Sequence, residues 1–108
     1  MPMISGGWAR TGCSMARLLG EEERRAALAE LPGWTETPDR NAIRKSFKFK
    51  SFNEAFAFMT RAALVAEKLD HHPDWSNVYN RVEVTLSTHS AGGVTELDIA
   101  FAKKMNSF

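Results

Sequence analysis

Three histidines are the side chains of this sequence best suited to chemistry. His71 and His72 are adjacent and precede Pro73, and His89 lies further along the chain. An imidazole titrates near neutral pH, with an unperturbed pKa of about 6.5, so it can donate or accept a proton at cellular pH. The adjacent pair and the third histidine could therefore supply an acid and a base to a small ligand. The spacing alone equally allows three polar residues at the ends of helices and strands.

A metal site is a second interpretation of the same histidines. With Glu67, Asp70 or Asp98 they could form a set of two or three histidines and a carboxylate. Directly adjacent histidines do not usually point at one ion, however, and the H-x-x-x-H spacing of helical metal sites is missing. The single cysteine, Cys13, lies near the start of the sequence, which disfavours covalent cysteine catalysis. We therefore expect neither a metal nor another cofactor.

Length and composition indicate one globular domain. The chain has 108 residues, of which 44% are hydrophobic and 25% charged, and this leaves room for one core. The net charge of +1 gives no electrostatic reason to expect nucleic acid or a membrane as a partner. No apolar run approaches the ~18 residues that a membrane span needs. A single cysteine also fits a reducing compartment, which favours a cytoplasmic location.

Residues 1–14 differ from the rest of the sequence. They contain three glycines and no acidic residue, and termini without an apolar face to dock are rarely ordered. We predict a disordered extension, followed by one domain over residues 15–108. The lack of acidic residues is also weakly similar to an organelle-targeting peptide. Targeting to an organelle by this extension therefore remains an alternative to the cytoplasm. A nuclear location is a further alternative.

Local patterns predict three helices. Acidic residues at the start and a Pro-Gly pair after the end indicate a helix over residues 21–30. Residues 51–54 have the pattern of a capping box and open the longest helix, which extends to about Leu69. Residues 95–98 have the same kind of pattern and open the last helix.

The longest helix has more apolar residues than one core face needs. One stripe recurs at three- and four-residue steps and consists of Phe52, Phe56, Met59, Ala63 and Ala66. Phe58 and Val65 lie off this stripe, so a second face is also partly apolar. A surplus apolar face on a small domain indicates a helix-to-helix contact with another subunit.

Two segments alternate between apolar and polar residues, as half-buried strands do. They are residues 41–50 and residues 78–88, and a short extended piece around Trp34 precedes them. Residues 90–93 have the composition of a loop. The order of helix, strand, strand, helix, strand and helix favours an α+β fold, with the helices on one face of an antiparallel sheet.

Several of these residues, taken in order, resemble the signature of the pterin-4a-carbinolamine dehydratases. The matching residues are Glu67, the run His71-His72-Pro73, Tyr79, His89 and Asp98. The string AEKLDHHPDWSNVYNRVEVTLSTH, residues 66–89, resembles the core of that family, and the upstream segments LPGW and FKFKSFNEAFAFMTRAA also match. The resemblance extends from about Met15 to the C-terminal helix.

This resemblance implies a fold, an assembly and a reaction. The implied fold is a four-stranded antiparallel sheet with three helices packed on one face. Members assemble as homodimers or homotetramers, by pairing sheets or by packing long helices. The reaction is the dehydration of 4a-hydroxytetrahydrobiopterin to quinonoid dihydropterin, which is recycled to tetrahydrobiopterin, the cofactor of aromatic amino acid hydroxylases. A metal-independent hydro-lyase with a pterin substrate is therefore expected.

The resemblance also implies roles for individual residues. The catalytic residues are His71, His72 and His89, the substrate-binding residues are Asp70, Ser87 and Thr88, and the supporting residues are Glu67, Pro73, Trp75 and Asp98. Dehydration needs a proton for the departing 4a-hydroxyl and removal of the proton on N5. We expect His72 and His89 to make these transfers while His71 positions the hydroxyl. Which histidine is the acid is left open.

Some of the matching residues have simpler structural explanations, and at some positions the sequence differs from the family. Capping alone could account for Asp98, and Trp75 and Tyr79 could be packing residues with a hydrogen-bonded polar tip. Residues 90–93 are Ser-Ala-Gly-Gly, whereas the corresponding loop of animal members is similar to Glu-Cys-Ala-Gly. Leu97 stands where those animal members have an arginine. These departures bear on the fit to a particular pterin side chain.

A protein-interaction role is the alternative from another functional class. Animal members also resemble a dimerisation cofactor of a homeodomain transcription factor, a role that would use the helical surface instead of the histidines. Catalysis predicts sensitivity at His72 and His89, whereas partner binding predicts sensitivity at exposed apolar positions such as Phe58. No basic stripe supports direct DNA contact, so such a role would need a protein partner.

Overall fold

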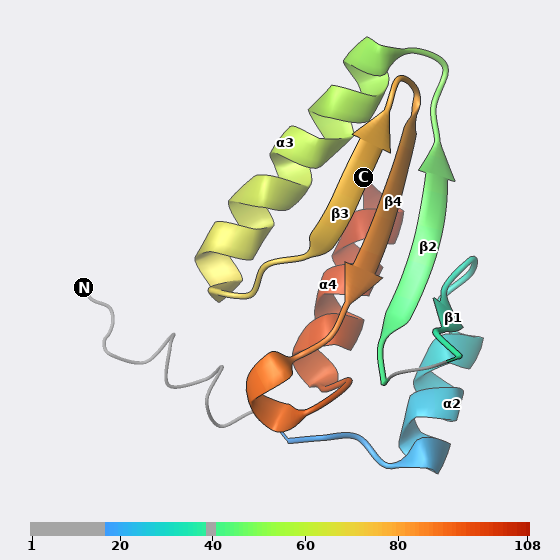
Figure 1. The fold of residues 1–108 in the computed structure, drawn as a ribbon, viewed down its shortest axis with the longest axis vertical. Coiled ribbons are helices and arrows are strands. Elements are labelled where there is room, and N and C mark those ends of the chain that lie inside the picture. Colours follow the sequence, from blue (N-terminus) through green and yellow to red (C-terminus); the bar gives the residue numbers. More distant parts are fainter. Residues whose placement is uncertain (1–16, 39–40) are drawn as a thin grey trace.

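The computed structural model describes residues 17–38 and 41–108. Its elements in chain order are α2 (Glu21–Ala29), β1 (Thr35–Glu36), β2 (Ile43–Lys48), α3 (Phe52–Leu69), β3 (Asp74–Val78), β4 (Arg81–Leu86), a 3-10 turn (His89–Ala91) and α4 (Glu96–Ser107). The helices lie where the sequence predicts them (Figure 1). The extension predicted over residues 1–14 lies outside the described residues. None of the described helices has the length and apolar character that a membrane crossing requires.

The strands form one antiparallel sheet in the order β1-β2-β4-β3. The register pairs Ile43 with Leu86, and both side chains are buried on the same face. The next pair, Arg44 and Thr85, points to the opposite face. The alternation predicted for residues 41–50 is confirmed, and it decides which face of the sheet meets the helices.

The prediction of a single strand over residues 78–88 is wrong, because this stretch contains a hairpin turn. β3 ends at Val78 and β4 begins at Arg81, with Tyr79 and Asn80 as the two-residue connection. Tyr79 has a left-handed backbone with a φ of 52°, which few residues other than glycine adopt. Because a tyrosine and not a glycine occupies this position, the sequence carries no signal of the turn. Tyr79 is also 63% exposed, so its interpretation as a packed residue is wrong.

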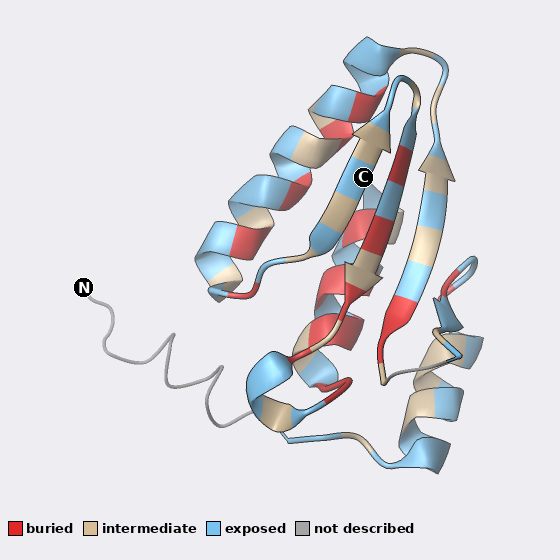
Figure 2. Cartoon of the chain, in the orientation of Figure 1, coloured by how far each residue is buried: buried red, intermediate tan, exposed pale blue. Residues whose placement is uncertain are grey.

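Two helices cover the apolar face of the sheet. α3 and α4 contact each other, and both contribute buried residues to one core cluster with β2 and β4 (Figure 2). The largest fully buried side chains are Phe101, Leu31, Ile43, Leu86 and Met105. α2 adds the partly buried Ala27 and Leu28 at the margin of this cluster. The predicted α+β fold, an antiparallel sheet of four strands with three helices, is confirmed for the described residues.

The buried face of α3 shares only Ala66 with the predicted stripe. The buried residues of this helix are Ala55, Phe58, Ala62 and Ala66. Phe52 and Phe56 of the predicted stripe are 48% and 55% exposed. The three alanines of this face let the helix approach α4 and the sheet closely, and Phe58 is the one large side chain among its buried residues. Phe58, predicted to be an exposed contact residue, is only 2% exposed and belongs to the core.

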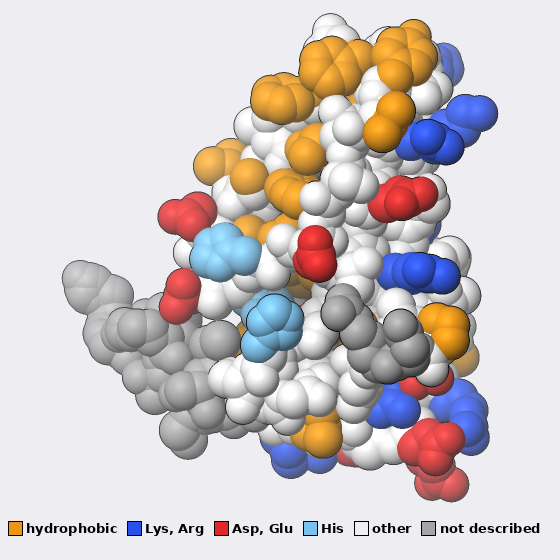
Figure 3. All heavy atoms as spheres, in the orientation of Figure 1, with side chains coloured by type: hydrophobic (Ala, Val, Ile, Leu, Met, Phe, Trp, Pro, Cys, Tyr) orange, Lys and Arg blue, Asp and Glu red, His pale blue; other side chains and the backbone are white. Residues whose placement is uncertain are grey.

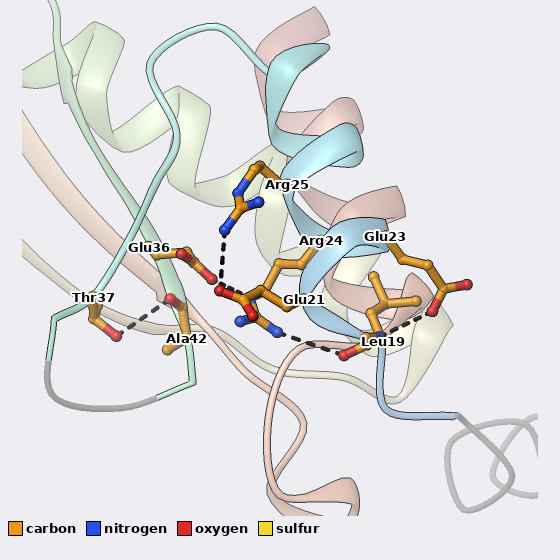
Figure 4. Close-up of polar contacts among 9 residues, drawn as sticks. Leu19, Glu21, Glu23, Arg24, Arg25, Glu36, Thr37 and Ala42 are labelled. Atoms are coloured by element: carbon orange, nitrogen blue, oxygen red, sulfur yellow. Dashed lines mark hydrogen bonds and ion pairs between the residues drawn. The ribbon is translucent and has the colours of Figure 1, made fainter.

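Polar contacts attach α2 to the rest of the domain (Figure 4). The Arg24 guanidinium pairs with the Glu36 carboxylate of β1. The Glu23 carboxylate accepts hydrogen bonds from Arg17 and from the Gly20 backbone N–H, which caps the first turn of the helix. These hydrogen bonds favour the charged carboxylate and lower the pKa of Glu23 to about 2.

Phe58→Ala should destabilise the protein strongly. The Phe58 ring lies 4.6 Å from that of Phe47 and 5.1 Å from that of Phe49, between ring centroids. Truncation leaves a cavity, so the free energy of unfolding should fall by about 3–5 kcal/mol. Tyr79→Ala, which removes an exposed aromatic side chain, should cost less than about 1 kcal/mol. Urea unfolding measures both values, and equal losses would contradict the assignment of Phe58 to the core.

Candidate active site

All three histidines line one cleft of about 500 Å³, here called the histidine cleft. It lies where the connection from α3 to β3 meets the chain that leaves β4. Histidine side chains lie close together on one face of the molecule, with acidic side chains beside them (Figure 3). The lining residues are Asp70, His71, His72, Pro73, Asp74, Thr85, Ser87, Thr88, His89 and Ser90. The fold thus brings distant segments of the sequence to one hollow.

The end of α3 positions the adjacent histidines. Asp70 caps the helix in a left-handed conformation, with a φ of 53°. The His71 N–H donates to the Ala66 carbonyl oxygen at 3.0 Å, as in a Schellman motif. Pro73 follows, and the chain continues as β3 because proline does not extend a helix. The backbone of His71 and His72 is therefore held between a helix cap and a strand.

A tight turn positions His89. The sequence predicts this residue at the end of a strand, but β4 ends at Leu86 and His89 begins the 3-10 turn. The Thr88 N–H donates to the Gly93 carbonyl oxygen at 2.7 Å, and the N–H groups of Gly92 and Gly93 donate back to the Thr88 carbonyl oxygen. The chain thus closes on Thr88, which is buried, while His89 stays exposed beside the cleft.

A buried carboxylate joins these two segments. Asp98 is 0% exposed, and its Oδ1 atom lies 2.5 Å from Nε2 of His71. Its Oδ2 atom accepts from the Thr88 hydroxyl and from the Thr95 N–H, both at 2.9 Å. The capping role predicted for Asp98 is confirmed, because Thr95 and Asp98 form the capping box of α4. The same carboxylate also holds a histidine of the cleft.

The Asp98 carboxylate determines how His71 can act. An ionised carboxylate only accepts hydrogen bonds, so Nε2 of His71 carries the hydrogen that points to it. The other ring nitrogen, Nδ1, is then the one that can take up a proton. The side chain of His71 is 6% exposed, so this carboxylate rather than bulk water orients the ring.

His72 is held by an exposed carboxylate. Its Nε2 atom lies 2.9 Å from Oε1 of Glu67, and the side chain of His72 is 58% exposed. Water screens such a pair, so it constrains the ring weakly and leaves it open to exchange protons with solvent. The two carboxylate–histidine pairs remain separate. Within the described part of the chain, no three His, Cys, Asp or Glu side chains are grouped to hold a metal ion.

Seven of the ten predicted site residues line the histidine cleft. Glu67 and Asp98 contact the histidines from outside the lining, and Trp75 lies on the core face of β3. The lining residues that sequence reasoning missed are Asp74, Thr85 and Ser90. Asp74 and Thr85 face each other across β3 and β4. The register of the hairpin could have revealed both, but the prediction of a single strand obscured it.

Comparison with known proteins establishes the family. The family described as Pterin 4 alpha carbinolamine dehydratase matches residues 17–108. The chain belongs to this family. The resemblance found in the sequence is thereby confirmed, and the match covers the histidine cleft and both carboxylates that contact its histidines.

Close relatives and solved structures agree with this assignment. A protein of Afipia carboxidovorans named "Putative pterin-4-alpha-carbinolamine dehydratase" is 66% identical over 92 residues, which cover 85% of this chain and 92% of the relative. A protein of Bradyrhizobium diazoefficiens with the same name is 65% identical over 92 residues, which again cover 85% of this chain and 92% of the relative. The crystal structure of a transcriptional coactivator/pterin dehydratase from Brucella melitensis has a TM-score of 0.81 and 62% identity, covering 82% of this chain and 95% of that chain.

A more distant solved structure belongs to a protein with a different described role. It is a pterin dehydratase-like protein identified as a RuBisCO assembly factor in the alpha-carboxysome. Its TM-score is 0.60 at 26% identity, and the match covers 69% of this chain and 87% of that chain. The fold is therefore found in proteins described by catalytic and by binding roles.

Asp98→Ala should weaken the domain and release the His71 ring. The substitution leaves the buried Thr95 N–H without its acceptor and the Thr88 hydroxyl with only the Thr95 hydroxyl as a partner, so the free energy of unfolding should fall by about 1–3 kcal/mol. Urea unfolding measures this loss. Glu96→Ala removes an exposed carboxylate from the same helical turn and should change stability by no more than about 0.5 kcal/mol.

The ring of His71 provides a second measurement on the same variant. Long-range nitrogen–proton spectra of the wild type should show His71 with its hydrogen on Nε2, whereas Asp98→Ala should show a mixture of tautomers. A wild-type ring with its hydrogen on Nδ1 would contradict the assignment of the Nε2 hydrogen to the contact with Asp98.

Proposed function

We propose that this protein is a 4a-hydroxytetrahydrobiopterin dehydratase that works by histidine acid–base catalysis. The observation that carries the proposal is the meeting of three histidines at one cleft in a member of this family. The cleft of about 500 Å³ lies within the range of about 300–1,000 Å³ found for small-ligand sites. A bicyclic pterin is a ligand of suitable size.

The reaction consists of two proton transfers and one bond cleavage. The bond between C4a and the hydroxyl oxygen breaks, and the hydroxyl leaves as water after receiving a proton. The proton on N5 is removed, and the electron pair of that N–H bond forms the C4a–N5 double bond of the quinonoid product. Because these steps need no change of oxidation state and no covalent intermediate, we propose a reaction without a metal or cofactor.

The three histidines divide these tasks according to how they are held. The Asp98 carboxylate fixes the ring of His71, which suits it to position the 4a-hydroxyl. His72 and His89 are exposed at the cleft, which suits them to exchange protons with the substrate and with water. Asp70 and Ser87 line the same cleft and offer polar atoms to the pterin ring, whereas Thr88 lines it with a buried hydroxyl that Asp98 and Thr95 already hold.

The product would return to the tetrahydrobiopterin pool in the cytoplasm. Quinonoid dihydropterin must be reduced before an aromatic amino acid hydroxylase can use it again, so the proposed reaction belongs to cofactor recycling. The single cysteine supports the cytoplasmic location, since it fits a reducing compartment.

His72→Ala and His89→Ala should each reduce dehydratase turnover by about 10²–10⁴-fold, because each removes one proton-transfer group. The decay of chemically generated 4a-hydroxytetrahydropterin, followed by absorbance with and without protein, measures this loss. Glu83→Gln serves as the control, since Glu83 is exposed on β4 outside the cleft and should retain full turnover. Full turnover in both histidine variants would overturn the assignment.

Assembly into a homodimer or homotetramer is the second part of the proposal. Three large apolar side chains of α3 are exposed, Phe52, Phe56 and Leu64, and together they are here called the α3 strip. The rings of Phe52 and Phe56 lie 5.8 Å apart between centroids. A strip of this kind supports packing against the same helix of a second copy.

Phe56→Glu should reduce the mass of the assembly in solution, since it places a charge in the middle of the α3 strip. Size-exclusion chromatography with light scattering measures this mass. Arg61→Glu, at an exposed position on the polar margin of the same helix, is the matched control and should leave the mass unchanged. An unchanged mass for Phe56→Glu, or a monomeric wild type, would contradict the proposed interface.

A protein-binding role is the second candidate function, and the α3 strip is the observation that favours it. The similar structure of a pterin dehydratase-like protein identified as a RuBisCO assembly factor supports this candidate. The two roles separate experimentally, because dehydration depends on His72 and His89 whereas partner binding depends on the α3 strip.

A further inference from the structure

The exposed face of α3 that carries the α3 strip leads directly to the histidine cleft. This face follows steps of three or four residues, the spacing of neighbours on one side of a helix, through Phe52, Phe56, Thr60, Leu64 and Glu67. Hydrophobic side chains accordingly run along α3 toward acidic and histidine side chains near its end (Figure 3). The face ends at the Glu67 carboxylate, whose Oε1 atom lies 2.9 Å from Nε2 of His72.

Thr60 lies at the centre of this face. Its hydroxyl already donates to the Phe56 carbonyl oxygen at 2.9 Å, so the side chain can be covered without losing a hydrogen bond. Phe56 lies four residues before Thr60, and Leu64 lies four residues after it. Two copies of α3 that cross antiparallel at Thr60 therefore place Phe56 of each copy against Leu64 of the other. The same face then serves both copies, as a two-fold interface requires.

The same crossing brings Phe52 of one copy to Glu67 of the other. Phe52 lies eight residues before Thr60 and Glu67 seven residues after it, or about 12 Å and about 10 Å along the helix axis. The two positions therefore meet within one helical turn. Side chains lean toward the N-terminus of their own helix, so the Phe52 ring extends past Glu67 toward His72 of the other copy.

We infer that Phe52 of a second copy covers the Glu67–His72 pair and thereby holds His72 in place for proton transfer. This inference rests on the proposed dehydration and the proposed interface, and it adds a positioning residue that acts from another subunit. In the single chain the side chains of Glu67 and His72 are 79% and 58% exposed, so water competes for their hydrogen bond. An aromatic ring over the pair excludes this water, and a hydrogen bond is stronger where the local dielectric is low.

Turnover per subunit should therefore depend on assembly. The decay of 4a-hydroxytetrahydropterin measures turnover at a series of protein concentrations, and light scattering measures the mass at each of them. Turnover should fall about three- to tenfold when the assembly dissociates, the effect of one hydrogen bond. Phe56→Glu gives the value of the dissociated chain and should show this low turnover at every concentration. Arg61→Glu, at an exposed position off the strip, is the matched control and should behave as the wild type.

Mixed assemblies test whether Phe52 acts across the interface. Phe52→Ala retains His72 but provides no cover, whereas His72→Ala retains Phe52 but lacks a proton-transfer group. When the two variants are coexpressed, each Phe52→Ala subunit receives the ring of a His72→Ala neighbour. Turnover per Phe52→Ala subunit should then rise about three- to tenfold over that of Phe52→Ala alone. Coexpression with the double variant Phe52→Ala/His72→Ala, which has no ring to give, should produce no rise.

The outcomes separate this inference from the proposals on which it rests. Equal turnover per subunit in Phe56→Glu and the wild type, or no gain in the mixed assemblies, would overturn the inference and leave the dehydratase standing. An unchanged mass for Phe56→Glu would overturn the interface and the inference together. A wild type without turnover at any concentration would overturn the proposed function itself.

Discussion

The buried carboxylate of Asp98 is the interaction on which both the fold and the histidine cleft depend. It caps α4 through the Thr95 N–H, accepts from Thr88 beside β4 and holds the ring of His71 after α3. A buried charge is tolerated only where donors surround it, and here the donors come from three separate segments. One side chain therefore fixes the start of a helix and the orientation of a histidine at once.

The starts of the helices could be predicted because capping depends on neighbouring residues. The face that each helix buries could not, because it depends on tertiary packing. Capping patterns are read within four residues, so Ser51 and Thr95 marked the starts of α3 and α4 correctly. The sequence shows two apolar faces on α3, and only contact with α4 and the sheet decides that the face with Phe58 and the alanines is buried. The turn at Tyr79 was equally hidden, because its left-handed backbone is imposed by the pairing of β3 with β4.

The candidate site was predictable where residue type carries the chemistry. Histidines at the ends of helices and strands are recognisable in a sequence, and here their order resembled a known family. The meeting of His71, His72 and His89 at one cleft could therefore be expected. The pairing of His71 with Asp98 could not, because capping already explained the aspartate.

The contact between residues 71 and 98 encloses the whole β3–β4 hairpin, and this has a consequence for biosynthesis. A hairpin joins neighbouring segments and can pair early, whereas contacts between distant segments form late. A ribosome releases α4 after every histidine has already emerged. A nascent chain that ends before this helix would contain all three imidazoles and yet lack the aspartate that orients the first of them. Completion of the final helix is thus the step that makes the cleft whole.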